Sequence, residues 1–225
     1  MNKVALFDFC ETLANFQTAD AFVNYVASNY PLSRNIRRNK IRHALQSLKI
    51  ITVVERLFPK CSFNKRLVLW QLKGYNLSTI ENASREYYFK IVKPNLIAET
   101  IERLRALQDD GWRVLIVSAG YETYLKWFCQ DFDIEIKDLI AVKIKFNQEG
   151  VCLGCFDGGD RLWDKVDILS KRFESKKIQS IAFSDGLSDL PMLMWADEGV
   201  VVRKRNKTSW NEKLNYNFKE IIWDY

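Results

Sequence analysis

The chain has 225 residues, of which 48% are hydrophobic and 28% are charged, and its formal net charge is +6. This length allows one sizeable hydrophobic core with room for a smaller appended module. The balanced composition, with few Gly and Pro residues, excludes collagen-like, low-complexity and wholly disordered proteins.

The cysteine and histidine content further restricts the classes of protein that fit this sequence. Five cysteines cannot all pair within one chain, so they indicate reduced thiols of an intracellular protein. The single histidine, His43, disfavours mechanisms and metal sites that need two. The apolar run from Val4 stops at Asp8, too early for a signal peptide, and no apolar run is long enough to span a membrane. We expect a cytoplasmic protein that starts near Met1.

The first half of the chain is predicted to be helical after one strand. Val4 to Phe7 form a short apolar run that ends in Asp8, which is typical of a buried parallel strand. Apolar residues at helical spacing then predict a helix over 16–30, which Pro31 ends. Further helical patterns follow at 33–49, 51–58, 63–73 and 78–91. We expect four aromatic residues of this part in its core: Trp70, Tyr75, Tyr87 and Tyr88.

Strands and helices alternate in the second half. Pro94 is expected in the first turn of a helix that Gly111 ends. Strands are then predicted at 113–117, 181–184 and 199–202, helices at 121–130, 165–173 and 190–196, and a hairpin at 139–146 and 151–156. This alternation indicates a parallel α/β sheet. The apolar stretch from Trp210 to Trp223 is expected to form a helix docked on the core, and it would equally suit a dimer contact.

The simplest layout is a sheet whose first strand is separated from the rest by an all-helical insertion. Residues 14–91 carry 13 Lys/Arg and 4 Asp/Glu, a net charge of +9, whereas the remainder has a net charge of −3. A basic insertion over an acidic core suits an anionic ligand held between them. A solvated basic face would give the same pattern.

Four short motifs are predicted to lie at the carboxyl ends of strands. They are Asp8 with Thr12 in FDFCETL, Ser118 in VLIVSAG, Lys165 in RLWDKVDIL, and Asp185 with Asp189 in FSDGLSDLPML. Ligands of open α/β sheets bind at the carboxyl ends of the strands, so we expect these side chains to meet there. Each motif alone is weak, because a lone Asp after a strand is usually a turn or cap residue, and a lone Lys on a helix is usually solvated.

Together the motifs fit phosphoryl transfer. Asp8 can act as a carboxylate nucleophile. Asp185, with Asp8 and a loop carbonyl, supplies the oxygen ligands that Mg²⁺ prefers. Ser118 and Lys165 can bind the phosphoryl oxygens.

Two further side chains can support these groups. Asp189 can orient Lys165 or a metal-bound water. Thr12 can brace the loop after the first strand by hydrogen bonding to backbone.

This ordered set of motifs resembles the haloacid dehalogenase (HAD) phosphohydrolases. The nearest resemblance is to their phosphoserine-phosphatase-like branch, in which a helical cap domain is inserted directly after the first strand. It covers residues 3–13 and 94–205, and the cap matches in position and helical character. The resemblance implies a Rossmann-like parallel-sheet α/β core, residues 1–13 and 92–225, with an inserted all-helical cap domain at 14–91.

The resemblance also implies an activity, Mg²⁺-dependent hydrolysis of a phosphomonoester through an aspartyl-phosphate. The substrate would be a small phosphorylated metabolite, and the basic insertion suits one with further negative charge. By this resemblance the nucleophile is Asp8. The magnesium ligands are Asp8, Asp185 and the backbone carbonyl of Cys10, and Asp189 supports the metal. The phosphate-binding residues are Ser118 and Lys165.

Cys10 departs from the family pattern. Family phosphatases usually have a second Asp two residues after the nucleophile, acting as general acid and base, and this chain has Cys10 there. The metal ligand at this position is a backbone carbonyl, so Mg²⁺ binding should survive. A thiol is a poor hydrogen-bond donor and is not matched, as an acid, to an alkoxide leaving group. Loss of general acid–base catalysis lowers the rate by about 10²–10⁴-fold. Glu11 is a weaker substitute, because adjacent loop side chains usually diverge.

Three outcomes are therefore open. The enzyme is slow or prefers good leaving groups, or it transfers the phosphoryl group to an acceptor other than water. Alternatively, the chain is a catalytically impaired phosphate-binding protein that kept the site.

The remaining features have simpler interpretations. Cys152 and Cys155 form a single CxxC motif in a predicted strand, where positions three apart face opposite sides, so we expect packing rather than zinc binding. A basic segment comprises Arg34, Arg37, Arg38, Lys40 and Arg42. No nucleic-acid fold signature accompanies it, so no nucleic-acid partner is expected. A membrane-surface role is similarly weak, although a lipid-linked or polyanionic substrate would fit.

Overall fold

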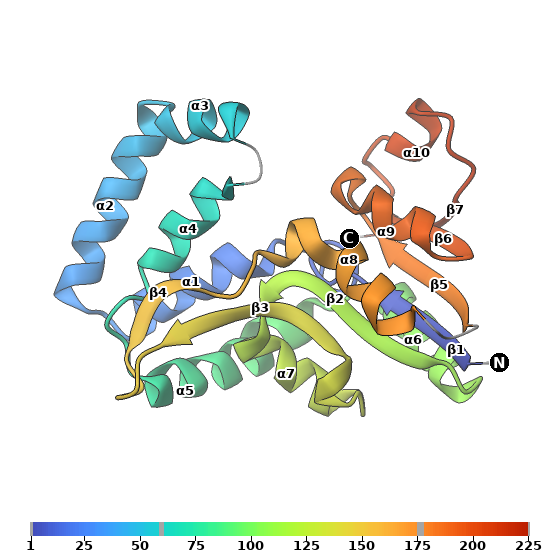
Figure 1. Cartoon of the computed structure of the whole chain (residues 1–225), viewed down its shortest axis with the longest axis horizontal. Helices are drawn as coiled ribbons and strands as arrows, with labels where there is room; N and C mark the ends of the chain where they lie inside the picture. Colours follow the sequence, from blue (N-terminus) through green and yellow to red (C-terminus); the bar gives the residue numbers. More distant parts are fainter. Residues whose placement is uncertain (1, 59–60, 175–177, 225) are drawn as a thin grey trace.

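A computed structural model describes residues 2–58, 61–174 and 178–224. Its centre is a seven-stranded sheet in the order β4-β3-β2-β1-β5-β6-β7 (Figure 1). All neighbouring strands are parallel except β3 and β4, which form an antiparallel hairpin. The strands are β1 (Asn2–Phe7), β2 (Arg113–Tyr121), β3 (Leu139–Phe146), β4 (Cys152–Asp157), β5 (Ile178–Ser184), β6 (Glu198–Lys204) and β7 (Lys219–Trp223).

Helices surround the sheet and fill the connection between β1 and β2. This connection contains α1 (Thr18–Asn29), α2 (Ser33–Ser47), α3 (Ile50–Leu57), α4 (Phe63–Trp70), α5 (Leu77–Tyr87), the π-helix η2 (Tyr88–Val92), the 3₁₀-helix η3 (Lys93–Asn95) and α6 (Ala98–Asp109). The later helices are α7 (Glu122–Asp131), η4 (Ile136–Asp138), α8 (Arg161–Phe173), η5 (Leu187–Asp189), α9 (Leu190–Trp195) and α10 (Trp210–Lys213).

The continuous apolar run of β1 follows from its central place in the sheet. Ala5 and Phe7 belong to the core cluster shared with α1, α5, α6 and α7, whereas Val4 and Leu6 belong to the cluster shared with α8 and α9. Side chains alternate between the faces of a strand, so a strand covered on both faces is apolar throughout. The predicted parallel α/β sheet is thereby confirmed.

The prediction of a helix over the C-terminal stretch was wrong. Residues 210–223 contain only the four-residue helix α10, followed by the edge strand β7, which pairs in parallel with β6. The β-branched pair Ile221 and Ile222 favours a strand, and β6 would otherwise leave its backbone groups unpaired at the edge.

Two element boundaries also differ from the prediction. Pro94 lies in η3, because α6 begins only at Ala98. β2 continues past Val117 to Tyr121, with a shift in its pairing register on the way, so Ser118 lies within the strand. The aromatic prediction holds for Tyr75, Tyr87 and Tyr88, which are buried, whereas Trp70 is half-buried.

The β3–β4 hairpin ties the helical connection to the sheet. Gly74 N donates to Cys152 O at 2.9 Å, and Cys152 N donates to Tyr75 O at 2.8 Å. Gly154, with φ +69°, brings β4 against α4: an added Cβ would lie 2.8 Å from Lys73 Cβ and 3.1 Å from Trp70 Cα. Only a residue without a side chain allows this approach.

Gly154→Ala should therefore destabilise the protein more than a change at a matched glycine. Gly111 also has positive φ, +76°, but an added Cβ would have nothing within 4 Å. Gly111→Ala should cost only backbone strain, about 1–2 kcal/mol, whereas Gly154→Ala adds a steric clash, for a total of about 2–4 kcal/mol. Urea unfolding measures both, and equal losses would contradict the proposed close packing.

Candidate active site

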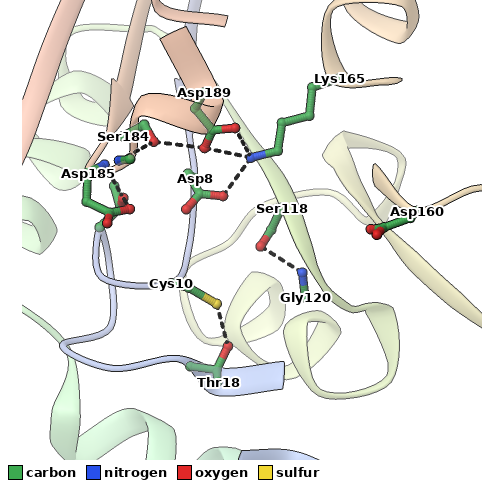
Figure 2. A network of polar contacts seen from close by, with 12 residues as sticks. Asp8, Cys10, Thr18, Ser118, Gly120, Asp160, Lys165, Ser184, Asp185 and Asp189 are labelled. Atoms are coloured by element: carbon green, nitrogen blue, oxygen red, sulfur yellow. Dashed lines mark hydrogen bonds and ion pairs between the residues drawn. The ribbon is translucent and has the colours of Figure 1, made fainter. Parts of the chain in front are cut away.

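The first two acidic residues of the site lie at the ends of neighbouring strands. Asp8 follows β1, and its backbone N–H donates to Phe183 O of β5 at 3.0 Å. Asp185 follows β5, where its backbone N–H donates to Thr12 Oγ1 at 3.0 Å and its carbonyl accepts from Trp210 Nε1 at 2.7 Å. Because β1 and β5 pair in parallel, both carboxylates lie at the same edge of the sheet (Figure 2).

Lys165 lies between two of the carboxylates. Its Nζ is 2.8 Å from Asp8 Oδ1 and 2.8 Å from each oxygen of Asp189. Ser184 Oγ donates to Asp189 Oδ2 at 2.8 Å, which fixes that carboxylate. Burial alone would lower the pKa of Lys165, but the charges of Asp8 and Asp189 raise it above its ordinary value. Lys165 is therefore a permanent buried cation.

The carboxylates are crowded enough to perturb one another. Burial raises the pKa of Asp8 to about 6, although the Lys165 charge acts in the opposite direction. Burial and the charge of Asp8 raise the pKa of Asp185 to about 8. The site therefore holds more negative charge than one lysine neutralises.

Ser118 approaches the same edge from β2. The side chain is 1% exposed, and its Oγ accepts a hydrogen bond from Gly120 N at 3.0 Å (Figure 2). Gly120 is needed there, because an added Cβ would lie 2.4 Å from the hydroxyl of Tyr124. This turn within the strand orients the Ser118 hydroxyl beside the carboxylates.

All of these groups border one cavity of about 250 Å³. Its lining includes the six residues to which the sequence analysis gave a catalytic, phosphate-binding or metal-binding role: Asp8, Cys10, Ser118, Lys165, Asp185 and Asp189. The expectation that the separate motifs meet at the carboxyl edge of the sheet agrees with this geometry.

A comparison with protein-family models identifies the family to which this chain belongs. Residues 5–194 match the haloacid dehalogenase-like hydrolases. The chain belongs to this family. Among curated protein sequences, none matches the chain. The family accounts for the order of the four motifs along the chain.

Solved structures share this HAD fold at low identity. A protein of unknown function from Bordetella pertussis Tohama I has a TM-score of 0.78 at 16% identity, covering 98% of each chain. A phosphoserine phosphohydrolase-like protein from Francisella tularensis has a TM-score of 0.64 at 17% identity, covering 96% of this chain and 94% of its own. A structure of a phospho-aspartyl intermediate analogue of phosphoserine phosphatase has a TM-score of 0.65 at 18% identity, covering 99% of this chain and 95% of its own.

Cys10 lines the cavity of this HAD protein, and its thiol contacts Thr18. Its Sγ is 3.0 Å from Thr18 Oγ1, which is 2.7 Å from the hydroxyl of Tyr124. Burial and the charge of Asp8 raise the pKa of the Cys10 thiol to about 11. The thiol is therefore protonated at neutral pH and cannot take a proton from water.

The carboxylate of Glu11 binds side chains outside the main cavity or in its lining rather than the candidate site residues. Its carboxylate accepts a hydrogen bond from Gln17 Nε2 at 2.8 Å and forms an ion pair with Lys207. Partial burial acts in the opposite direction, but these two partners lower the pKa of Glu11. Glu11 lines a second, smaller cavity with Lys207, which disfavours it as a substitute for the missing acid.

The helical connection contributes charged groups that sequence reasoning missed. Lys65 of α4 and Asp20 of α1 line the cavity. Lys65 forms an ion pair with Asp160, and burial lowers its pKa. Asp20 lies 3.1 Å from Arg42 Nη2. The positive charge of residues 14–91 was the only signal for Lys65, and it did not distinguish this lysine from the others.

The donor set suits a hard divalent cation. Within the described ranges, no group of three His, Cys, Asp or Glu side chains has metal-binding geometry. The candidate ligands are instead two carboxylates, Asp8 and Asp185, and one backbone carbonyl, that of Cys10. Magnesium accepts such oxygen ligands, and a cation would offset both the burial and the neighbouring negative charges that raise the pKa of Asp185. Asp189 has both oxygens on Lys165, so its support of a metal stays a prediction.

Proposed function

We propose that this protein hydrolyses a small phosphomonoester through an aspartyl-phosphate on Asp8, with Mg²⁺ as cofactor. The observation that carries the proposal is the buried ammonium of Lys165, held 2.8 Å from Asp8 Oδ1 at the cavity. A fixed cation beside a carboxylate suits both the approach of an anionic phosphoryl group and the charge that develops on its oxygens. The family of the chain and its phosphatase-like structural neighbours support the same reaction class.

In this proposal the helical connection acts as a cap domain, residues 14–91, over a core of residues 1–13 and 92–225. Lys65 of α4 lines the cavity together with Asp8 of the core, which supports a substrate bound between the two parts. Its positive charge suits a substrate with negative charge beyond the phosphoryl group.

A cytoplasmic location remains an expectation. No helix among the described residues is long and apolar enough to cross a membrane.

The proposed first step forms the covalent intermediate. A carboxylate oxygen of Asp8 attacks phosphorus, and the bond from phosphorus to the leaving oxygen breaks. The leaving oxygen keeps the electron pair; an alkoxide takes a proton from water, whereas a p-nitrophenolate leaves as the anion. Ser118 and Lys165 bind the phosphoryl oxygens, while Asp189 holds the Lys165 ammonium in place. Asp8, Asp185 and the Cys10 carbonyl would hold Mg²⁺, which supplies further positive charge for the phosphoryl oxygens.

The proposed second step, hydrolysis of the aspartyl-phosphate, needs a base that Cys10 does not supply. Water attacks phosphorus, its proton must pass to a base, and inorganic phosphate and the Asp8 carboxylate are released. A thiol with a pKa of about 11 is protonated at neutral pH and does not accept that proton. The same observation favours the second candidate, a phosphotransferase whose acceptor brings its own base. A phosphate-binding protein without turnover is the third.

The first test is p-nitrophenyl phosphate turnover by Asp8→Asn and a matched surface variant. Wild-type turnover should require Mg²⁺, and Asp8→Asn should abolish it because an amide is no nucleophile. Asp109→Asn makes the same change at an exposed position on α6 and should leave turnover intact. Turnover that survives Asp8→Asn would contradict the proposal. No wild-type turnover, with Mg²⁺ still bound by calorimetry, would favour the phosphotransferase or binding protein.

The second test separates the two steps by rapid mixing. p-Nitrophenolate leaves without needing a proton, so wild type should release a burst of about one equivalent per site before a slow steady state. Cys10→Asp should remove the burst and raise the steady-state rate by up to about 10²-fold, with a larger gain for alkyl phosphates. Cys10→Ser, similar in size but also unable to take a proton, should keep the burst. Linear release by wild type would contradict a slow second step.

A further inference from the structure

The segment formed by α2 and α3 exposes an unusual amount of apolar surface. Half of the 16 large apolar side chains that are exposed among the described residues lie within residues 32–58. They are Leu32, Ile36, Ile41, Leu48, Ile50, Val53, Leu57 and Phe58. Scattered apolar residues are normal on a protein surface, but such a concentration marks an interaction site. We call this segment, residues 32–58, the outer helical surface.

α3 provides the centre of this surface. Ile50, Val53 and Leu57 lie at i, i+3 and i+7 on one face of the helix, and their exposed fractions are 38%, 54% and 67%. Ile51 lies off this face and is only 6% exposed. Figure 1 shows α3 at the far end of α2 and α4, away from the sheet. The apolar face of α3 is therefore turned outward, while its other side packs on the protein.

The same surface is strongly basic. Residues 32–58 carry seven Lys/Arg and one acidic residue, Glu55. Two of the cations bond to the protein itself: Arg42 to Asp20 at 3.1 Å, and Arg38 to the carbonyl of Lys73. The other five are exposed and form no ion pair with a described residue: Arg34, Arg37, Lys40, Lys49 and Arg56. The segment that exposes these apolar side chains thus also carries five cations that are not neutralised.

We propose that the outer helical surface docks on an anionic lipid bilayer. Apolar side chains of an amphipathic helix enter the boundary between headgroups and acyl chains, and Lys and Arg side chains pair with anionic headgroups. A nucleic acid would use the cations but leave Val53, Leu57 and Phe58 in water. A second copy of the chain would cover the apolar face but would bring like charges together. Of these three partners, only the bilayer satisfies both kinds of side chain.

This inference does not depend on the proposed hydrolysis. The test uses the full chain in co-sedimentation with vesicles of phosphatidylcholine, alone or mixed in equal parts with phosphatidylglycerol. The protein should bind the mixed vesicles, bind phosphatidylcholine alone much more weakly, and dissociate as salt is added. Val53→Ser combined with Leu57→Ser should weaken binding by about tenfold or more.

The matched control is Ile136→Ser combined with Met194→Ser. These side chains are 58% and 64% exposed, but they lie outside the outer helical surface. The control should bind vesicles like wild type, and thermal unfolding checks that both double variants are folded. Absence of wild-type binding, equal loss in the two double variants, or unchanged binding by the Val53/Leu57 variant would overturn the proposal. Self-association or nucleic-acid binding that only the Val53/Leu57 variant loses, without vesicle binding, would also overturn it.

Discussion

The buried ammonium of Lys165 is the interaction on which the site depends. Lys165 reaches from α8 to Asp8 after β1 and to Asp189 in η5, so one cation joins three elements that are distant in the sequence. Each of these charges would be costly to bury alone, and together they offset one another through short, charge-assisted hydrogen bonds. Ser184 extends the network by fixing Asp189. The arrangement keeps a positive charge where an anionic substrate would bind.

The core of the site was predictable because its residues follow from sheet topology. The apolar run of β1, buried on both faces, located Asp8, and the alternation of strands and helices located Ser118 and Asp185 at the same edge. The C-terminal stretch was misassigned because its apolar residues suit a helix face and an edge strand alike, and only the open edge of β6 decides between them. Lys65 was missed because helix packing, not local pattern, turns it toward the cavity.

Two properties of the chain emerged only from three-dimensional contacts. The sequence identified Cys10 as a departure from the family, but only the structure shows that burial and the nearby charge of Asp8 raise the pKa of its thiol and keep it protonated. Likewise, the positive charge of the helical connection was visible in the sequence, whereas the exposure of Val53 and Leu57 was not. Charge alone gave weak support for a membrane surface, and the apolar face of α3 supplies the missing part.

The covalent intermediate is the central claim, and trapping it is the most direct measurement. Wild-type protein would be mixed with a phosphate donor and Mg²⁺, quenched in acid, digested and mapped by mass spectrometry. We expect one phosphoryl group on Asp8, which hydroxylamine should remove as it removes other acyl phosphates. The slow second step proposed for Cys10 should let this adduct accumulate. A phosphoryl group on another residue, or turnover without any adduct, would contradict the account.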